Sequence, residues 1–197
     1  MNKQVEFHYD FGSPYSYLAY HALPGIAKAA GAEVVWRPML LGGVFQATGN
    51  HSPAEVPVKG AHMQVDLKRW AACFGVPFRM NPFFPINTLA LMRGATGLQM
   101  KGDAAAFDRY NAAMYAAMFE TPKNLNQPEE IGKVLHAAGF DPAQFLAMIN
   151  DQAVKDKLKE NTAAAVGRGV FGAPTFFVGD EMYWGQDRLH FVEQALA

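Results

Sequence analysis

The sequence predicts an α/β fold in which a β-α-β half and a β-β-α half are separated by a large all-helical insertion. Three observations predict it. Residues 5–38 read as strand, helix and strand, residues 61–168 carry helical patterns almost throughout, and residues 174–197 read as strand, turn, strand and helix. Two strands joined by a helix favour parallel pairing in the first half.

The first half begins with a strand over residues 5–11, whose apolar side chains fall at odd positions. Pro14 suits the first turn of the next helix, over residues 14–30, because a proline there removes no intrahelical hydrogen bond. Pro24-Gly25 predicts a kink or a division of that helix. The second strand covers residues 33–38.

Glycines and prolines recur along residues 40–60, which we expect to be irregular. A helical block follows this stretch. Asn87 is expected to cap one of its helices, and the others are predicted over residues 61–74, 103–119, 127–138, 141–150 and 151–168.

The last half reads as a hairpin of residues 174–178 and 181–184, followed by an amphipathic helix. This order of elements is that of the thioredoxin fold with a helical block inserted between its halves. We therefore expect a thioredoxin-like domain of residues 1–50 plus 168–197, and an inserted helical domain of residues 51–167.

Composition narrows the class of protein. The net charge is −1, from 18 acidic and 17 basic side chains. No basic block is present, so a nucleic-acid partner is not expected. With neither a signal-peptide pattern nor an apolar run long enough for a bilayer, we expect a cytoplasmic protein that makes no membrane contact.

The single cysteine, Cys73, is interpreted as a small core residue, and His8 as a polar residue with satisfied partners. No metal-ligand spacing is found, so no metal site is expected.

Three motifs lie where the predicted elements meet. They are Asp-Phe-Gly-Ser-Pro-Tyr-Ser-Tyr-Leu at residues 10–18, Phe-Gly-Ala-Pro-Thr at 171–175 and Trp-Gly-Gln-Asp-Arg-Leu at 184–189. Together they resemble the motifs of 2-hydroxychromene-2-carboxylate isomerases and kappa-class glutathione transferases. Both families belong to the DsbA-like branch of the thioredoxin superfamily, and the resemblance covers essentially the whole chain.

Ser13 and Ser16 occupy the turn into the first helix, where a redox member of the superfamily has Cys-x-x-Cys. Two serines cannot exchange disulfides. A hydroxyl at the positive end of a helix favours an anion, and a thiolate placed there has a lowered pKa. The sulfur must then come from a ligand, for which glutathione is the abundant cytosolic candidate. The alternative is that Ser13 is only an N-cap.

The resemblance implies further glutathione contacts. Pro174 is expected to follow a cis peptide bond and the backbone of Ala173 to pair with the cysteinyl backbone of glutathione. Asp187 and Arg188 are expected to bind the γ-glutamyl end. The other implied cofactor-binding residues are Asn50, Lys59, Trp184, Gly185 and Gln186. The plainer alternatives are a proline that only starts a strand and an aspartate that only caps a helix beside a solvated arginine.

The resemblance implies a glutathione-dependent isomerase that performs cis-trans isomerisation of an aromatic enone through transient addition of the glutathione thiolate. Phe45, Phe83 and Phe84 are candidates for a flat apolar substrate pocket. The isomerases place a lysine, and then an Asn-Arg pair, around the Gly-Asn of this loop, whereas the corresponding positions here are Phe45 and Glu55-Val56. A different electrophile is therefore expected.

Two other functions remain open. A kappa-like glutathione transferase or peroxidase would use the same residues but consume glutathione. A non-catalytic thioredoxin-fold binding module would have lost its cysteines without gaining a reaction. The expected partner is a small aromatic or other electrophilic substrate, and relatives suggest a homodimer.

Overall fold

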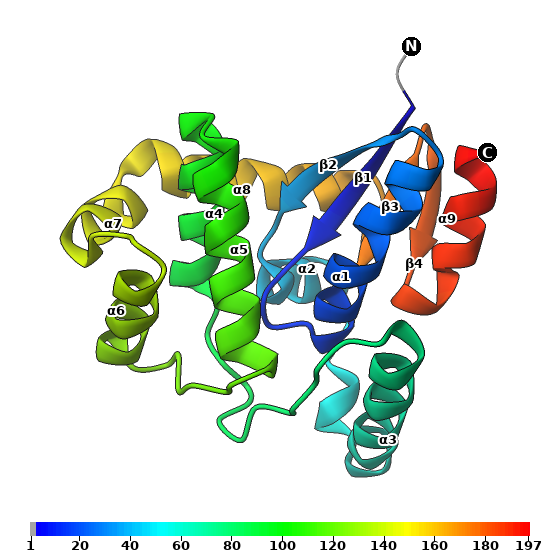
Figure 1. Ribbon diagram of the computed structural model, residues 1–197, viewed down its shortest axis with the longest axis horizontal. Coiled ribbons are helices and arrows are strands. Elements are labelled where there is room, and N and C mark those ends of the chain that lie inside the picture. Colours follow the sequence, from blue (N-terminus) through cyan, green and yellow to red (C-terminus); the bar gives the residue numbers. More distant parts are fainter. Residues whose placement is uncertain (1–2) are drawn as a thin grey trace.

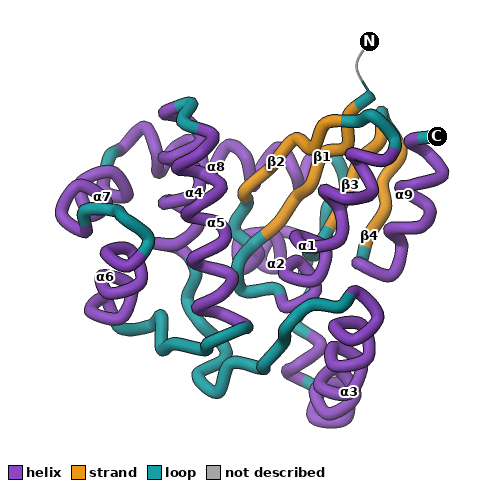
Figure 2. Tube along the Cα trace, in the orientation of Figure 1, coloured by secondary structure: helices purple, strands orange, loops and turns teal. Residues whose placement is uncertain are grey.

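The computed structural model describes residues 3–197. Its strands gather at one side of the molecule and most of its helices at the other (Figures 1 and 2). The first half consists of β1 (Gln4–Tyr9), α1 (Pro14–Ala29) and β2 (Glu33–Pro38), and the last half of β3 (Thr175–Val178), β4 (Glu181–Trp184), η2 (Gln186–Arg188) and α9 (Leu189–Leu196). Between them lie α2 (Leu41–Thr48), η1 (Pro53–Glu55), α3 (Pro57–Phe74), α4 (Leu89–Lys101), α5 (Ala104–Phe119), α6 (Pro128–Ala137), α7 (Pro142–Asn150) and α8 (Gln152–Gly167).

The four strands form one sheet in the order β2-β1-β3-β4. β1 pairs with β2 in parallel, as predicted, and β3 is antiparallel to both β1 and β4. The predicted thioredoxin-like order with a helical insertion, here α3–α8, is confirmed. Because β1 pairs with β3, the topology brings the beginning and the end of the chain side by side.

One face of the sheet packs on the main core. Phe7 stacks on Phe176 across β1 and β3, with ring centroids 5.3 Å apart, and both are fully buried. Tyr9 is also buried and donates its hydroxyl hydrogen bond to Asn111 Oδ1 of α5, at 2.9 Å. The sheet and the helical block therefore share one continuous hydrophobic core.

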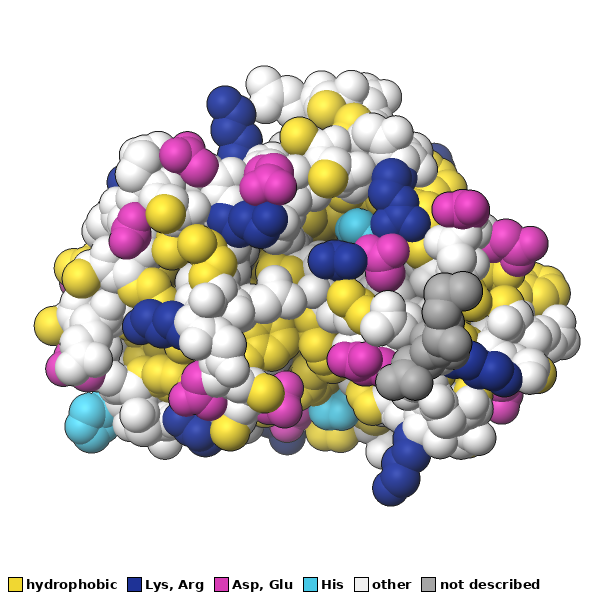
Figure 3. Space-filling model, turned by 90° about the horizontal axis from the view of Figure 1, so that it is seen from above, with side chains coloured by type: hydrophobic (Ala, Val, Ile, Leu, Met, Phe, Trp, Pro, Cys, Tyr) yellow, Lys and Arg dark blue, Asp and Glu magenta, His cyan; other side chains and the backbone are white. Residues whose placement is uncertain are grey.

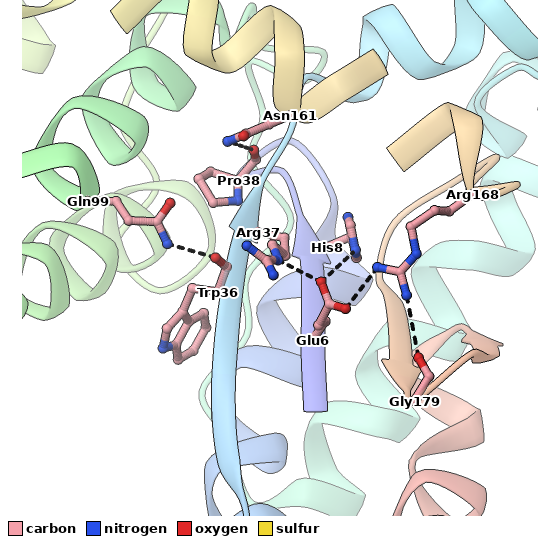
Figure 4. A network of polar contacts seen from close by, with 9 residues as sticks. All are labelled: Glu6, His8, Trp36, Arg37, Pro38, Gln99, Asn161, Arg168 and Gly179. Carbon is pink, nitrogen blue, oxygen red and sulfur yellow. Dashed lines mark hydrogen bonds and ion pairs between the residues drawn. The ribbon is translucent and has the colours of Figure 1, made fainter. Parts of the chain in front are cut away.

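The opposite face of the sheet carries charged side chains beside a smaller core under α2 and α8 (Figure 4). Glu6 accepts hydrogen bonds from Arg37 Nε at 2.6 Å and from Arg168 Nη1 at 2.8 Å. His8 is only 4% exposed, and neither ring nitrogen has a hydrogen-bond partner among residues 3–197. Burial lowers its pKa to about 4. The expectation that His8 has satisfied partners was therefore wrong.

Residues 40–60 are mostly helical, against expectation, because they form α2, η1 and the start of α3. Partners distant in the sequence hold the beginning of α2. The backbone N–H of Leu40 donates to Thr162 Oγ1 at 3.0 Å, and that of Leu41 donates to Asp10 Oδ2 at 2.8 Å. Local glycine content could not indicate these tertiary caps.

Four smaller expectations also change. β1 ends at Tyr9 rather than at residue 11, because the Asp10 carbonyl accepts the Ser13 N–H at 3.0 Å and turns the chain. α1 continues undivided through Pro24, and its buried face holds it against the sheet. Cys73 is exposed on α3 rather than buried in the core. The N-cap of α4 is Thr88 rather than Asn87, although the Asn87 side chain accepts the Leu89 N–H at 3.0 Å.

The outer surface carries both signs of charge. On the face drawn in Figure 3, basic and acidic side chains lie interspersed rather than separated. Within residues 3–197, no helix combines the length and the hydropathy needed to cross a membrane.

Candidate functional site

A cleft of about 840 Å³ lies at the N-terminal end of α1. Its walls come from distant parts of the chain: the turn between β1 and α1, the segment from α2 to α3, the loop before α4, and the segments that precede β3 and follow β4. The sequence-predicted residues on these walls are Ser13, Phe45, Asn50, Lys59, Phe84, Ala173, Pro174, Trp184, Gly185, Gln186, Asp187 and Arg188.

Ser13 is the N-cap of α1, and it also lines the cleft. Its Oγ accepts the Ser16 N–H at 3.1 Å and donates to the Ala173 carbonyl at 2.9 Å. α1 has no acidic residue in its first turn, so the positive end of the helix dipole is not neutralised from within the helix. To donate to a ligand, the hydroxyl must rotate away from the Ala173 carbonyl.

The peptide bond between Ala173 and Pro174 is cis, as the family resemblance implied. The bond faces the start of α1, since the Ala173 carbonyl receives the Ser13 hydroxyl. The Pro174 carbonyl accepts the Gly185 N–H at 2.9 Å, which joins this turn to the segment after β4. A second cis bond, Phe84-Pro85, lies on another wall of the same cleft.

The segment after β4 forms the C-terminal wall. Gly185 has a φ of +98°, which favours glycine, and the next residue, Gln186, is 5% exposed. Asp187 and Arg188 form an ion pair with each other. Trp184 packs on Phe171, with ring centroids 4.9 Å apart, and is 46% exposed.

The loop after α2 forms another part of the lining. Asn50 Nδ2 donates to the Phe171 carbonyl at 2.8 Å, so it ties this loop to the segment before the cis proline. Of the three phenylalanines predicted for a substrate pocket, Phe45 and Phe84 line the cleft and Phe83 does not. Phe83 is 45% exposed, and its N–H donates to Asn81 Oδ1 at 2.9 Å.

Asp10 is the residue that sequence reasoning missed. Its side chain accepts the N–H groups of Gly12 and Leu41, both at 2.8 Å, and it also bonds the Thr88 side chain. It is 1% exposed, and burial raises its pKa despite these hydrogen bonds. The sequence did offer one signal of a buried carboxyl group. Asp10 comes directly after a strand, and both of its neighbours in the sequence are aromatic.

Tyr15 and Asp66 were also missed. The Tyr15 hydroxyl donates to Asp66 Oδ2 at 3.1 Å, and both residues line the cleft. Partial burial and the nearby carboxylate raise the pKa of Tyr15, which keeps the phenol protonated. Within residues 3–197, no group of three His, Cys, Asp or Glu side chains is placed to hold a metal ion.

Comparisons with known proteins match the chain over nearly its full length. The family model described as DSBA-like thioredoxin domain matches residues 4–197. A 2-hydroxychromene-2-carboxylate isomerase of Pseudomonas sp. (strain C18) is 36% identical, over 98% of this chain and 89% of its own length. Glutathione S-transferase kappa 1 of Caenorhabditis elegans is 27% identical, over 98% and 90%. A solved 2-hydroxychromene-2-carboxylate isomerase structure superimposes with a TM-score of 0.83 at 32% identity, over 98% of this chain and 94% of that chain.

Proposed function

The chain belongs to the DSBA-like thioredoxin domain family, and from this premise we propose that it is a glutathione-dependent isomerase. The observation that carries the proposal is the meeting of Ser13, the N-terminus of α1 and the Ala173 backbone in one cleft. Cys73, the chain's single cysteine, is not on that cleft. A sulfur that uses this anion-favouring end of α1 must therefore arrive with a ligand.

The cleft fits a tripeptide thiol in size and in chemistry. Its volume of about 840 Å³ lies within the range of small-molecule sites. Lys59 and Arg188 can each pair with a carboxylate, and Asp187 can pair with an ammonium group. When bound, glutathione would supply a nucleophilic sulfur that adds to an unsaturated carbon reversibly.

The chain's own residues would bind glutathione, orient its sulfur and shield the aromatic enone from water. Ser13 would donate a hydrogen bond to the sulfur, and the α1 N-terminus would favour the thiolate over the thiol. The Ala173 backbone would hold the cysteinyl unit in an extended conformation. Phe45, Phe84 and Trp184 would provide a flat apolar surface for an aromatic enone and exclude water from it.

A kappa-like transferase is the second candidate, favoured by the similarity to glutathione S-transferase kappa 1 over 98% of this chain. Both reactions would use Ser13, Asp187 and Arg188, and they differ in the fate of the thiol. An isomerase returns glutathione unchanged, whereas a transferase consumes one molecule per turnover. A count of free thiol before and after turnover of a cis aromatic enone separates the two reactions.

Titration calorimetry with reduced glutathione tests whether the chain binds the cofactor that the proposal requires. We expect saturable binding, weakened at least tenfold by Arg188→Ala, since that variant removes a charge-assisted hydrogen bond. Arg109→Ala, on the outward side of α5, is the matched control and should bind as the wild type does. No detectable binding at millimolar glutathione would instead favour a non-catalytic binding module.

A further inference from the structure

The charges that line the cleft are unequal. Its only lysine and arginine side chains, within the described chain, are Lys59 and Arg188. Its acidic side chains are more numerous: Asp10, Glu55, Asp66 and Asp187. Asp10 is buried and its side chain accepts backbone N–H groups, and Asp187 is paired with Arg188. The carboxylates left to face a second ligand are those of Glu55 and Asp66.

Glutathione would use both cations, if the proposed function holds. The tripeptide carries a carboxylate at each end and one ammonium group. Arg188 lies on the C-terminal wall and Lys59 lies on α3, so the two cations come from different walls of the cleft. Each can take one carboxylate, and Asp187 can take the ammonium group. No lysine or arginine then remains for a carboxylate on the electrophile.

The remaining carboxylates are fixed in place by their own partners. Glu55 Oε1 accepts the Ser52 N–H at 3.2 Å, in a capping box at the start of η1. Asp66 Oδ2 accepts the Tyr15 hydroxyl at 3.1 Å. Phe45 and Val56 also line the cleft and add apolar surface. The part of the lining that remains for the electrophile therefore combines apolar surface with these two carboxylates.

We propose that this part of the lining selects uncharged aromatic electrophiles and rejects those that carry a carboxylate. A second carboxylate brought to within about 4 Å of Glu55 or Asp66 loses about tenfold in affinity in a partly solvated site. The inference rests on the proposed function, and it separates this chain from relatives whose name specifies a carboxylate substrate.

Two isosteric conjugates test the inference without knowledge of the natural substrate. S-(4-carbamoylbenzyl)glutathione and S-(4-carboxybenzyl)glutathione differ in one charge and share the whole glutathione part. Their dissociation constants are measured by calorimetry at about pH 8. We expect the carbamoyl conjugate to bind about tenfold more tightly.

Variants assign the effect to the two carboxylates. Glu55→Gln keeps the capping box, since glutamine also serves at that position, and together with Asp66→Asn it should bring the ratio of the two dissociation constants close to one. Glu193→Gln, on the exposed side of α9, is the matched control and should keep the wild-type ratio.

The possible failures are distinct. Equal or tighter binding of the carboxybenzyl conjugate by the wild type overturns the inference and leaves the glutathione function standing. A preference for the carbamoyl conjugate that persists in the double variant also overturns it, because the charges would then lie elsewhere. If neither conjugate nor glutathione binds, the proposed function fails and takes the inference with it.

Discussion

At the scale of single residues, Asp10 joins three parts of the cleft. Its buried carboxyl group holds the turn before α1 through Gly12, the start of α2 through Leu41, and the start of α4 through Thr88. Each of these segments forms part of the cleft lining. One side chain thus determines how the walls around Ser13 are placed.

Asp10→Asn tests this role. An amide has one acceptor oxygen, so its NH₂ group faces one of the two backbone N–H donors, and a buried donor is left without a partner. We expect the free energy of unfolding to fall by about 1–3 kcal/mol, measured in urea, and glutathione affinity to fall with it. Asp108→Asn, an exposed change on α5, is the control. Wild-type stability in Asp10→Asn would contradict the role.

His8 makes stability depend on pH. Its pKa in the folded protein, about 4, lies below the ordinary value near 6.5, so the unfolded chain takes up this proton first as the pH falls. The stabilisation is complete above pH 6.5 and is lost as the pH falls towards 4. Between pH 7.5 and pH 5.0 the loss amounts to about 2 kcal/mol.

The check is urea denaturation of the wild type and of His8→Leu at both pH values. The variant should lose about 2 kcal/mol less stability than the wild type over this interval. His136→Gln, which changes an exposed histidine of α6, should keep the wild-type dependence. The same pH dependence in His8→Leu as in the wild type would show that other groups cause it.

Single residues differ in how much of their role a sequence can reveal. Ser13 and Pro174 were predicted as site residues because the motifs that contain them, taken together, resemble those of a known family. Asp10 and His8 were not assigned correctly, because their surroundings come from elements distant in the sequence. Asp10 accepts the N–H at the start of α2, and His8 packs against Phe177 of β3 without a hydrogen-bond partner among the described residues. The buried side of α3 carries Met63, Leu67 and Ala71 at helical spacing, and Cys73 lies off that side.

At the scale of elements, α2 shows why propensity alone fails. It contains Gly42 and Gly43, which predict irregular structure. Gly43 lies against α8, since a Cβ there would lie 3.2 Å from the Thr162 side chain, which is a tight contact. The close approach of α2 and α8 compensates for the low helix propensity of the two glycines. That contact joins residues far apart in the sequence and so cannot be predicted from either helix alone.

Two glycines in other helices test helix packing as a matched pair. A Cβ at Gly94 of α4 would lie 2.6 Å from the Phe145 ring of α7, whereas Gly132 of α6 has nothing within 4 Å. Gly132→Ala should therefore raise the free energy of unfolding by up to about 1 kcal/mol. Gly94→Ala should lower it by about 1–3 kcal/mol. Similar gains in both variants would contradict the packing of α4 against α7.

At the scale of the whole molecule, the fold class and the order of elements could be predicted because each half carries its own periodicity and turn residues. The convergence of residues 10–18, 171–175 and 184–189 also followed from that fold class. The sequence could not show that the sheet and the helical block share one core, because that depends on long-range contacts such as Tyr9 with Asn111. The division at residues 50–51 and 167–168 stays a prediction.

Segments from both halves of the chain meet at the N-terminal end of α1, where Ser13 lies. The most direct measurement is a pH titration of the ultraviolet thiolate absorbance of glutathione bound to the wild type and to Ser13→Ala, with stability checked because Ser13 also caps α1. We predict a bound thiol pKa well below the ordinary value of about 8.5, and about one unit higher in Ser13→Ala. A bound thiol that titrates at its ordinary pH in the wild type would contradict a thiolate site at Ser13.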